Sequence, residues 1–96
     1  MIELKEAAMA LIRAPVSLYP LRTQRLSEVI GAAVEVFERR RLDTRPGPMS
    51  TMVTGSEAEV FAALSEAFHV AAQHGDAVMV ATVSNACPLD QGGSGR

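Results

Sequence analysis

Hydroxyl and amide side chains gather in three short stretches of this chain. The residues are Ser17 and Tyr19 in VSLYPL, Ser50 and Thr51 in GPMSTMVTG, and Ser84 and Asn85 in VSNACP. Such groups can pair with the ring nitrogens and amino group of a small planar heteroaromatic ligand, and the phenol can stack on its ring. The alternative is that they only satisfy turns and strand ends. Both interpretations are open at this point.

Groups that could carry out catalysis or bind a metal are sparse. His69 and His74 are five residues apart, whereas metal-binding histidines on one helix face are four apart, so both are expected on the surface. Cys87 is the only cysteine and has no base beside it in the sequence. The terminal GGSGR lacks the strand and helix that flank a phosphate-binding loop. The sequence therefore predicts no enzyme, no metal and no cofactor.

Composition limits the class of protein further. The chain has 96 residues, enough for one domain, and 48% of them are hydrophobic but only 4% aromatic. A formal net charge of −2 gives no broad basic surface for nucleic acid or an anionic membrane. No run of about 18 apolar residues occurs, and the apolar run near the N-terminus is too short for a signal peptide. A soluble cytoplasmic protein is the expectation.

Hydrophobic periodicity predicts six elements in the order β-α-β-β-α-β. The expected strands cover 9–19, 42–46, 49–54 and 76–87, and the expected helices lie in 23–42 and 56–75. The first strand has an apolar face at even positions, from Ala10 to Leu18. Pro15 cannot donate a ladder hydrogen bond, so a bulge or an unpaired side is expected there.

Each expected helix has one apolar stripe and a capping residue at its start. The stripes are Leu26, Ile30, Ala33 and Phe37 in the first helix, and Val60, Leu64, Phe68 and Ala71 in the second. Thr23 is the expected N-cap of the first helix. Ser56 and Glu59 form a capping-box pattern for the second. The arginines of ERRRL at 38–42 complement the helix dipole where the first helix should end.

This order of elements predicts an α+β fold, the ferredoxin-like βαββαβ sandwich, with two helices on one face of a four-stranded antiparallel sheet. The domain is expected over residues 1–88, followed by a disordered Gly/Ser-rich tail at 89–96. The uncovered sheet face is expected to display Leu11, Met79 and Val83. An apolar patch of this kind usually marks an interface, so the sequence predicts a homo-oligomer.

Three segments resemble the small thiamine-binding proteins related to YkoF. They are SLYPLRT at 17–23, GPMSTMVTG at 47–55 and VSNACP at 83–88. The resemblance covers about residues 9–88, and its most specific part is the Met-Ser-Thr run before a glycine and an acidic helix start. The candidate ligand-binding residues are thus Ser17, Tyr19, Met49, Ser50, Thr51, Ser84 and Asn85.

The resemblance implies a ferredoxin-like domain that assembles into dimers or tetramers and binds thiamine or its hydroxymethylpyrimidine half without catalysis. A role in thiamine transport, salvage or homeostasis would follow. One rival is a regulatory ligand-sensing module that acts on a separate partner protein. Another is an acylphosphatase-like hydrolase, but that enzyme needs a glycine-rich loop after the first strand, where this chain has YPLRTQRL.

Overall fold

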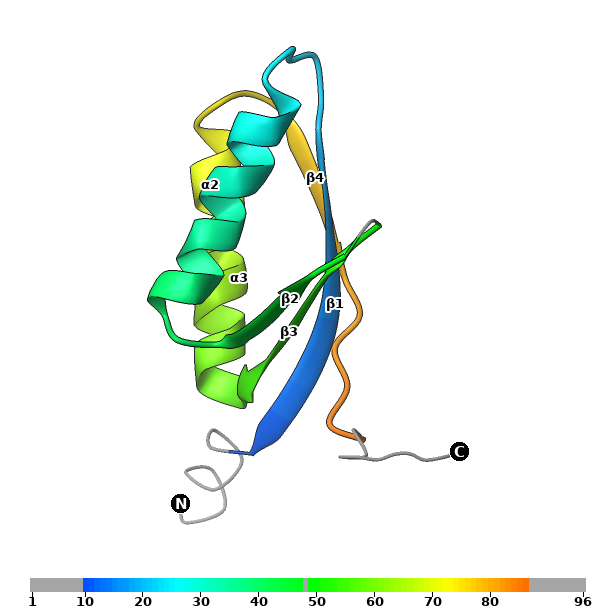
Figure 1. The fold of residues 1–96 in the computed structure, drawn as a ribbon, viewed down its shortest axis with the longest axis vertical. Helices are drawn as coiled ribbons and strands as arrows, with labels where there is room; N and C mark the ends of the chain where they lie inside the picture. The colour runs from blue at the N-terminus through cyan, green and yellow to red at the C-terminus, as the bar shows by residue number, and fades with distance from the viewer. Residues whose placement is uncertain (1–9, 48, 87–96) are drawn as a thin grey trace.

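The computed structural model describes residues 10–47 and 49–86, which form four strands and two helices. These are β1 (Leu11–Pro20), α2 (Leu26–Arg39), β2 (Asp43–Pro46), β3 (Thr51–Ser56), α3 (Glu57–Ala72) and β4 (Ala77–Ala81). Figure 1 shows both helices on one side of the sheet, which leaves the other side open. The predicted α+β, ferredoxin-like fold is confirmed. The tail expected at 89–96 lies outside the described residues.

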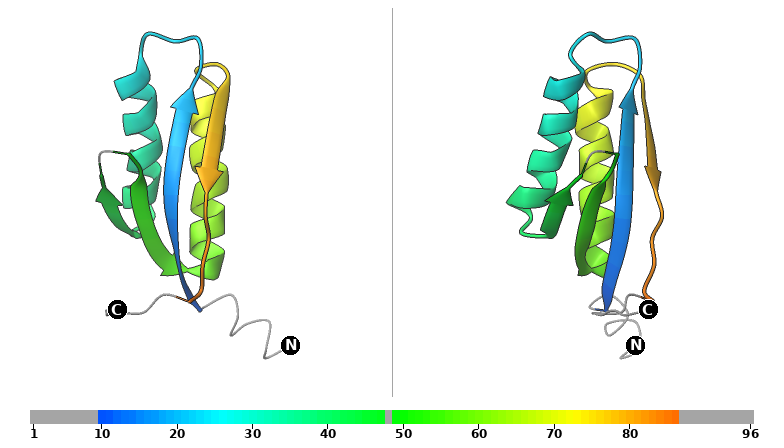
Figure 2. Two further views of the ribbon diagram at one scale, coloured as in Figure 1. Left: turned by 90° about the vertical axis from the view of Figure 1, so that its right-hand side faces the viewer. Right: turned by 45° about the vertical axis from the view of Figure 1, so that its right-hand side comes forward.

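The sheet is antiparallel throughout, with the strand order β2-β3-β1-β4 (Figure 2). Strand β1 pairs with β3 along its first half, from Leu11 to Val16, and with β4 along its second half, from Val16 to Pro20. The predicted unpaired side at Pro15 is confirmed. The Thr82 N–H donates to the Pro15 carbonyl over 3.3 Å, but proline has no N–H to return, and regular pairing of β4 ends at Ala81.

Register decides which side chains face the helices, because residues directly opposite in an antiparallel pair share a face. The even positions of β1 point toward the helices as predicted, and Ile12, Ala14 and Val16 are buried. Met79 pairs with Leu18 and therefore also points toward the helices. The prediction that Met79 lies on the open face was wrong.

The prediction that Val83 lies on the open face was wrong for the same reason. The register that joins Val16 to Ala81 and Arg13 to Ser84 puts Val83 opposite Ala14, on the helix side. Of the three residues predicted on the open face, Leu11 alone lies there. The open face nevertheless carries apolar side chains, because Tyr19, Val78 and Val80 project from it and are each about half exposed.

The buried stripes of the helices differ from the predicted ones. They consist of Val29, Ala33, Val36 and Phe37 in α2, and of Val60, Ala63, Ala67 and Ala71 in α3. Leu26, Ile30 and Phe68, which were expected inside, are 48%, 38% and 41% exposed. Small side chains let the helices approach the sheet and each other closely, so alanines occupy the contact and several larger residues lie at its margin.

The two helix starts differ in how well they match expectation. Helix α2 begins after Arg25, without a side-chain cap, because the Thr23 hydroxyl accepts from the Arg25 N–H (3.0 Å) in the turn before the helix. The prediction that Thr23 caps α2 was therefore wrong. In α3 the predicted cap is confirmed: the Ser56 hydroxyl accepts a hydrogen bond from the Glu59 N–H at 3.3 Å.

The cap predicts a stability effect for Ser56→Ala. Loss of the hydroxyl leaves the Glu59 N–H without its acceptor, and we expect the free energy of unfolding to fall by about 1 kcal/mol in denaturant titration. Ser65→Ala, on the exposed middle of the same helix, is the control and should change stability little, since alanine is the better helix former. Equal effects of the two substitutions would contradict a capping role.

A cluster of ion pairs joins the C-terminal end of α2 to α3. Arg40 Nε lies 2.9 Å from Glu66 and Arg40 Nη1 lies 3.2 Å from Glu59, while Arg39 Nη1 approaches Glu66 at 3.2 Å. Arg39 is in the last turn of α2, where it also complements the helix dipole as predicted. The hydrogen bond from Arg40 holds the pKa of the Glu66 carboxyl below its usual range, and Arg39 acts in the same direction.

This lowered pKa predicts a pH dependence of stability. A carboxyl whose pKa is lower in the folded state stabilises the fold above its unfolded pKa, near 4.3 for glutamate, and the effect is lost as pH falls through the folded value. Glu66→Gln should therefore lower the thermal midpoint at pH 7, and the difference from the parent should shrink as the pH drops below about 4. Thermal unfolding of both proteins from pH 3 to pH 7 measures this.

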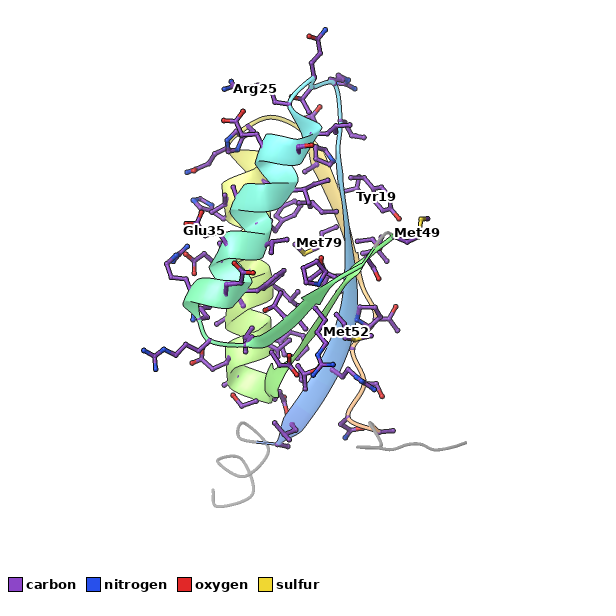
Figure 3. All side chains as sticks on the ribbon, in the orientation of Figure 1. Tyr19, Arg25, Glu35, Met49, Met52 and Met79 are labelled. Carbon is purple, nitrogen blue, oxygen red and sulfur yellow. The ribbon has the colours of Figure 1, made fainter. Side chains whose placement is uncertain are left out.

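Glu35→Gln is the matched control, because Glu35 is an exposed carboxylate on the outer side of α2 (Figure 3). A Glu66→Gln variant that differs from the parent equally at pH 3 and pH 7 would show that the ion pairs contribute nothing specific.

Candidate functional site

A pocket of about 120 Å³ lies between α2, the second half of β1 and the turn at residues 47–50. The offset pairing of β1 explains its position. The ladder with β3 ends at the Val16–Thr51 pair, whereas β1 continues to Pro20, so α2 extends over a part of β1 that β3 does not border. The space beneath α2 is closed at one end by the turn that joins β2 to β3.

Hydrocarbon and thioether groups form most of the pocket wall. The lining residues from the sheet are Val16, Leu18 and Met79, and those from the helix are Ile30, Ala33, Val34 and Phe37. In Figure 3 Met79 lies between the sheet and the helices. A wall of this kind suits the faces of a flat ring, and Ala33 provides space because its side chain is short.

Polar groups enter the pocket from the β3 side. Thr51 lies opposite Val16 and therefore shares the helix-facing side of the sheet, and Ser50 precedes it in the turn. Both residues are half-buried, and each hydroxyl can donate and accept a hydrogen bond. The pocket thus combines apolar walls with two hydroxyl-bearing residues at one end.

Among the described residues between β2 and β3, Gly47, Met49 and Ser50 take part in two hydrogen bonds. The Gly47 N–H donates to the Ser50 carbonyl at 2.8 Å, and the Ser17 hydroxyl donates to the Met49 carbonyl at 3.3 Å. The side chain of Met49 points outward at the tip of the hairpin and is 83% exposed (Figure 3). Ser17 therefore holds the turn against β1, and its hydroxyl is already engaged.

The structure brings together four of the predicted site residues. Ser17, Met49, Ser50 and Thr51 all line the pocket. Tyr19 lies instead on the open side of the sheet, opposite Val78, as Figure 3 also shows. Strand β1 lies between β3 and β4, but proximity of strands does not put Tyr19 into the same cavity.

Ser84 and Asn85 lie apart from the pocket as well. Ser84 bridges to Arg13, and the pocket begins at Val16, three residues further along β1, roughly 10 Å away. Both residues are exposed, and the Ser84 hydroxyl accepts a hydrogen bond from the Ala86 N–H at 3.0 Å. This geometry is typical of a turn that follows a strand.

Sequence reasoning missed the apolar wall of the pocket. Ile30 and Val34 are one helical turn apart on α2, and Ile30 had been interpreted as core. An apolar residue that stays partly exposed beside a buried stripe is the signal that could have indicated a cavity. Its partial exposure can be recognised only when the angle between helix and sheet is known. Met79 was missed because its strand register was unknown.

No described residue that lines the pocket carries an ionisable side chain. His69 lies near the end of α3, where its Nε2 is 3.2 Å from the Gln73 amide, and His74 Nδ1 is 3.1 Å from the Val70 carbonyl. Within residues 10–47 and 49–86, no three His, Cys, Asp or Glu side chains come close enough together to hold a metal ion. In the same residues, neither helix has the length and apolar character needed to span a membrane. Cys87 lies outside the described residues.

The fold and the site define a ferredoxin-like α+β domain with a pocket of single-ring size between its first helix and its sheet. A family model described as the YkoF-related family matches residues 12–90 of this chain. The chain therefore belongs to the YkoF-related family.

Solved structures agree with this fold. A hypothetical protein from Methanocaldococcus jannascii is similar with a TM-score of 0.73 and 26% identity, over 79% of this chain and 80% of that one. A proposed thiamine biosynthesis or salvage protein from Thermotoga maritima has a TM-score of 0.69 and 23% identity, over 76% and 81% of the two chains. A Streptococcus pneumoniae protein has a TM-score of 0.75 and 18% identity, over 82% and 90%. No curated protein sequence matches this chain.

Proposed function

We propose that this protein is a non-enzymatic cytoplasmic binding protein for thiamine or free hydroxymethylpyrimidine, and that the pyrimidine ring occupies the pocket beneath α2. The observation that carries the proposal is the pocket itself, which has apolar walls and the hydroxyl-bearing residues Ser50 and Thr51 at one end. Membership of the YkoF-related family and the assignment of the Thermotoga maritima protein to thiamine biosynthesis or salvage support this ligand class.

The size of the pocket supports a single ring rather than a whole two-ring ligand. Its volume of about 120 Å³ is of the order of the engineered cavity of roughly 150 Å³ that holds one benzene molecule. Pockets for drug-sized ligands are larger, from about 300 Å³ upward. The pyrimidine would therefore lie inside, and the thiazolium half of thiamine would lie at the mouth near the exposed Met49 side chain.

The chemistry of the lining supports binding without catalysis. An aminopyrimidine offers ring nitrogens as acceptors and an amino group as a donor, and the hydroxyls of Ser50 and Thr51 can serve either kind. Val16, Phe37 and Met79 contribute apolar surface for the ring faces. Since the described lining has no acid, base or thiol, the hydroxyls of Ser50 and Thr51 have no neighbouring group there that could activate them for nucleophilic attack.

Substitution of Thr51 by valine tests the proposal. Thr51→Val keeps the β-branched shape and removes only the hydroxyl, and a neutral hydrogen bond contributes about 0.5–1.5 kcal/mol. We expect the affinity for hydroxymethylpyrimidine and for thiamine to fall roughly three- to tenfold, with little change in thermal stability of the free protein. Calorimetric titration of parent and variant with hydroxymethylpyrimidine, thiamine and thiamine diphosphate measures this.

Thr54→Val is the matched control, because Thr54 is on the same strand but pairs with Arg13 on the open side of the sheet. It should leave all affinities unchanged. No measurable binding of any of the three compounds by the folded parent protein would overturn the proposed function. Binding that Thr51→Val leaves intact would place the ligand somewhere other than this pocket.

We also propose that the open sheet face is an interface between copies of this chain. The helices cover only the opposite face of the sheet. Apolar surface is exposed on the open face by Leu11, Tyr19, Val78 and Val80. A domain of this size can bury only about 60–70% of its unfolded surface, so association would add apolar burial that the single domain lacks.

The open-face interface predicts that Leu11→Lys lowers the molecular mass in light scattering. A lysine at residue 11, at the start of β1, would be desolvated without a partner in a face-to-face contact, whereas in a monomer it stays in water. Gln73→Lys adds the same charge after α3, away from the sheet, and should keep the parental mass. A folded Leu11→Lys protein of unchanged mass would show that this face is not an interface.

A further inference from the structure

The backbone of β1 directs its hydrogen-bonding groups alternately to its two neighbouring strands. Arg13 and Ser84 exchange backbone hydrogen bonds in both directions, each at 2.9 Å. In an antiparallel ladder such a pair alternates with residues that point the other way, so the odd residues of β1 face β4. The even residues face β3, in agreement with the bond from the Glu57 N–H to the Ala10 carbonyl at 2.8 Å.

Leu18 is the even residue at which β1 no longer has β3 beside it. The β1–β3 ladder ends at the Val16–Thr51 pair, and its next pair of hydrogen-bonding residues would be Leu18 and Met49. The alternation of β1 continues past this point, because the Leu21 N–H still donates on the β4 side, at 2.8 Å. The N–H and the carbonyl of Leu18 therefore point into the gap where β3 has ended.

The chain does not fill this gap with its own hydrogen bonds. The Met49 carbonyl, which a longer ladder would offer to the Leu18 N–H, accepts instead from the Ser17 hydroxyl at 3.3 Å. The Ser50 carbonyl accepts from the Gly47 N–H at 2.8 Å. Within residues 10–47 and 49–86, no protein group pairs with either backbone group of the half-buried Leu18. Backbone groups in such surroundings are normally paired, so both are available to a ligand or to water.

These two backbone groups lie where they can determine what the pocket selects. Leu18 lines the pocket together with Ser50 and Thr51. A hydroxyl can rotate to donate or to accept, so the two hydroxyls alone distinguish poorly between donors and acceptors on a ligand. A backbone N–H can only donate and a carbonyl can only accept, and Leu18 supplies one of each.

We propose, on the basis of the function proposed above, that the main chain of Leu18 determines the specificity of the pocket. Its N–H donates to a ring nitrogen of the ligand, and its carbonyl accepts from the amino group on the adjacent ring carbon. The edge of the ring thereby takes the place that the Met49 backbone would have in a longer ladder. The ligand class is that of uncharged 4-aminopyrimidines. Ser17 is a positioning residue, because its bond to the Met49 carbonyl keeps the Leu18 N–H free.

Two ligands that differ only at this edge test the proposal. The 4-oxo analogue of hydroxymethylpyrimidine has an oxygen in place of the amino group and a hydrogen on the adjacent ring nitrogen. Each backbone group of Leu18 would then meet a ligand group of its own kind, and sites built to hydrogen-bond a ligand reject such analogues. In calorimetric titration of the parent protein we expect the 4-oxo analogue to bind at least tenfold more weakly than hydroxymethylpyrimidine.

The titration separates failure of this proposal from failure of the proposed function. Affinities that differ less than threefold would overturn the reading of the edge by Leu18 and leave the proposed function intact, since rotating hydroxyls would give that result. Absence of binding of either compound would overturn the proposed function, and this proposal with it.

Amide hydrogen exchange gives an independent measurement on the parent protein. The Leu18 N–H should exchange rapidly in the free protein and at least tenfold more slowly with saturating hydroxymethylpyrimidine. The Val16 N–H, whose residue pairs with Thr51, is the control in the same strand and should be protected in both states. A Leu18 amide that is already protected without ligand, or that still exchanges rapidly when the ligand is bound, would overturn the proposal.

Ser17→Ala tests the positioning role. Without the hydroxyl, the Met49 carbonyl is released and can accept from the Leu18 N–H, which adds one pair to the ladder. We expect the affinity for hydroxymethylpyrimidine to fall at least threefold and the Leu18 amide to become protected in the free variant. Ser17→Thr restores the hydroxyl and should recover most of the affinity. A folded Ser17→Ala protein with parental affinity and a rapidly exchanging Leu18 amide would overturn the role of Ser17.

Discussion

The offset pairing of the central strand β1 is the constraint on which the rest of the structure depends. Its first half is hydrogen-bonded to β3 and its second half to β4, with Val16 shared by both ladders. One consequence is that the register of β1 decides which side chains of β3 and β4 face the helices. A second is that β1 has no β3 neighbour beyond Val16, which is where the pocket lies. A third is that β4 continues past its regular ladder to Ser84 and presents a long free edge.

Small side chains at the layer contact explain both the core and the exposed apolar surface. Ala14, Ala33, Ala63 and Ala67 are buried where the helices meet the sheet and each other, and they allow close approach. Larger residues such as Phe61 and Phe68 then remain at the margin of α3. The same arrangement leaves a cavity beside Ala33, because a short side chain under a helix does not fill the space that a leucine would fill.

The pocket and the proposed open-face interface use different parts of the fold. The pocket is bounded by α2 and the β2–β3 turn, on the helix side of the sheet. The open face is separated from the pocket by the thickness of the sheet. Strand β4 connects the two regions, since Val78 and Val80 project from the open face and Met79 lines the pocket.

The sequence by itself determined the order of the elements, the fold class, the inward face of β1, the cap at Ser56 and the unpaired side of Pro15. These features follow from local properties: periodicity, a short polar side chain before a helix, and a missing N–H. It also indicated the four pocket residues Ser17, Met49, Ser50 and Thr51, which lie in adjacent strands or turns. Only the tertiary structure decided that Tyr19 lies on the open face, that Ser84 and Asn85 lie apart from the pocket, and that Met79 points inward. The reason is that a register shift of one residue moves a side chain to the other face of a sheet. For an apolar strand such as β4, alternation of polarity cannot fix that register, and only hydrogen bonding to β1 does.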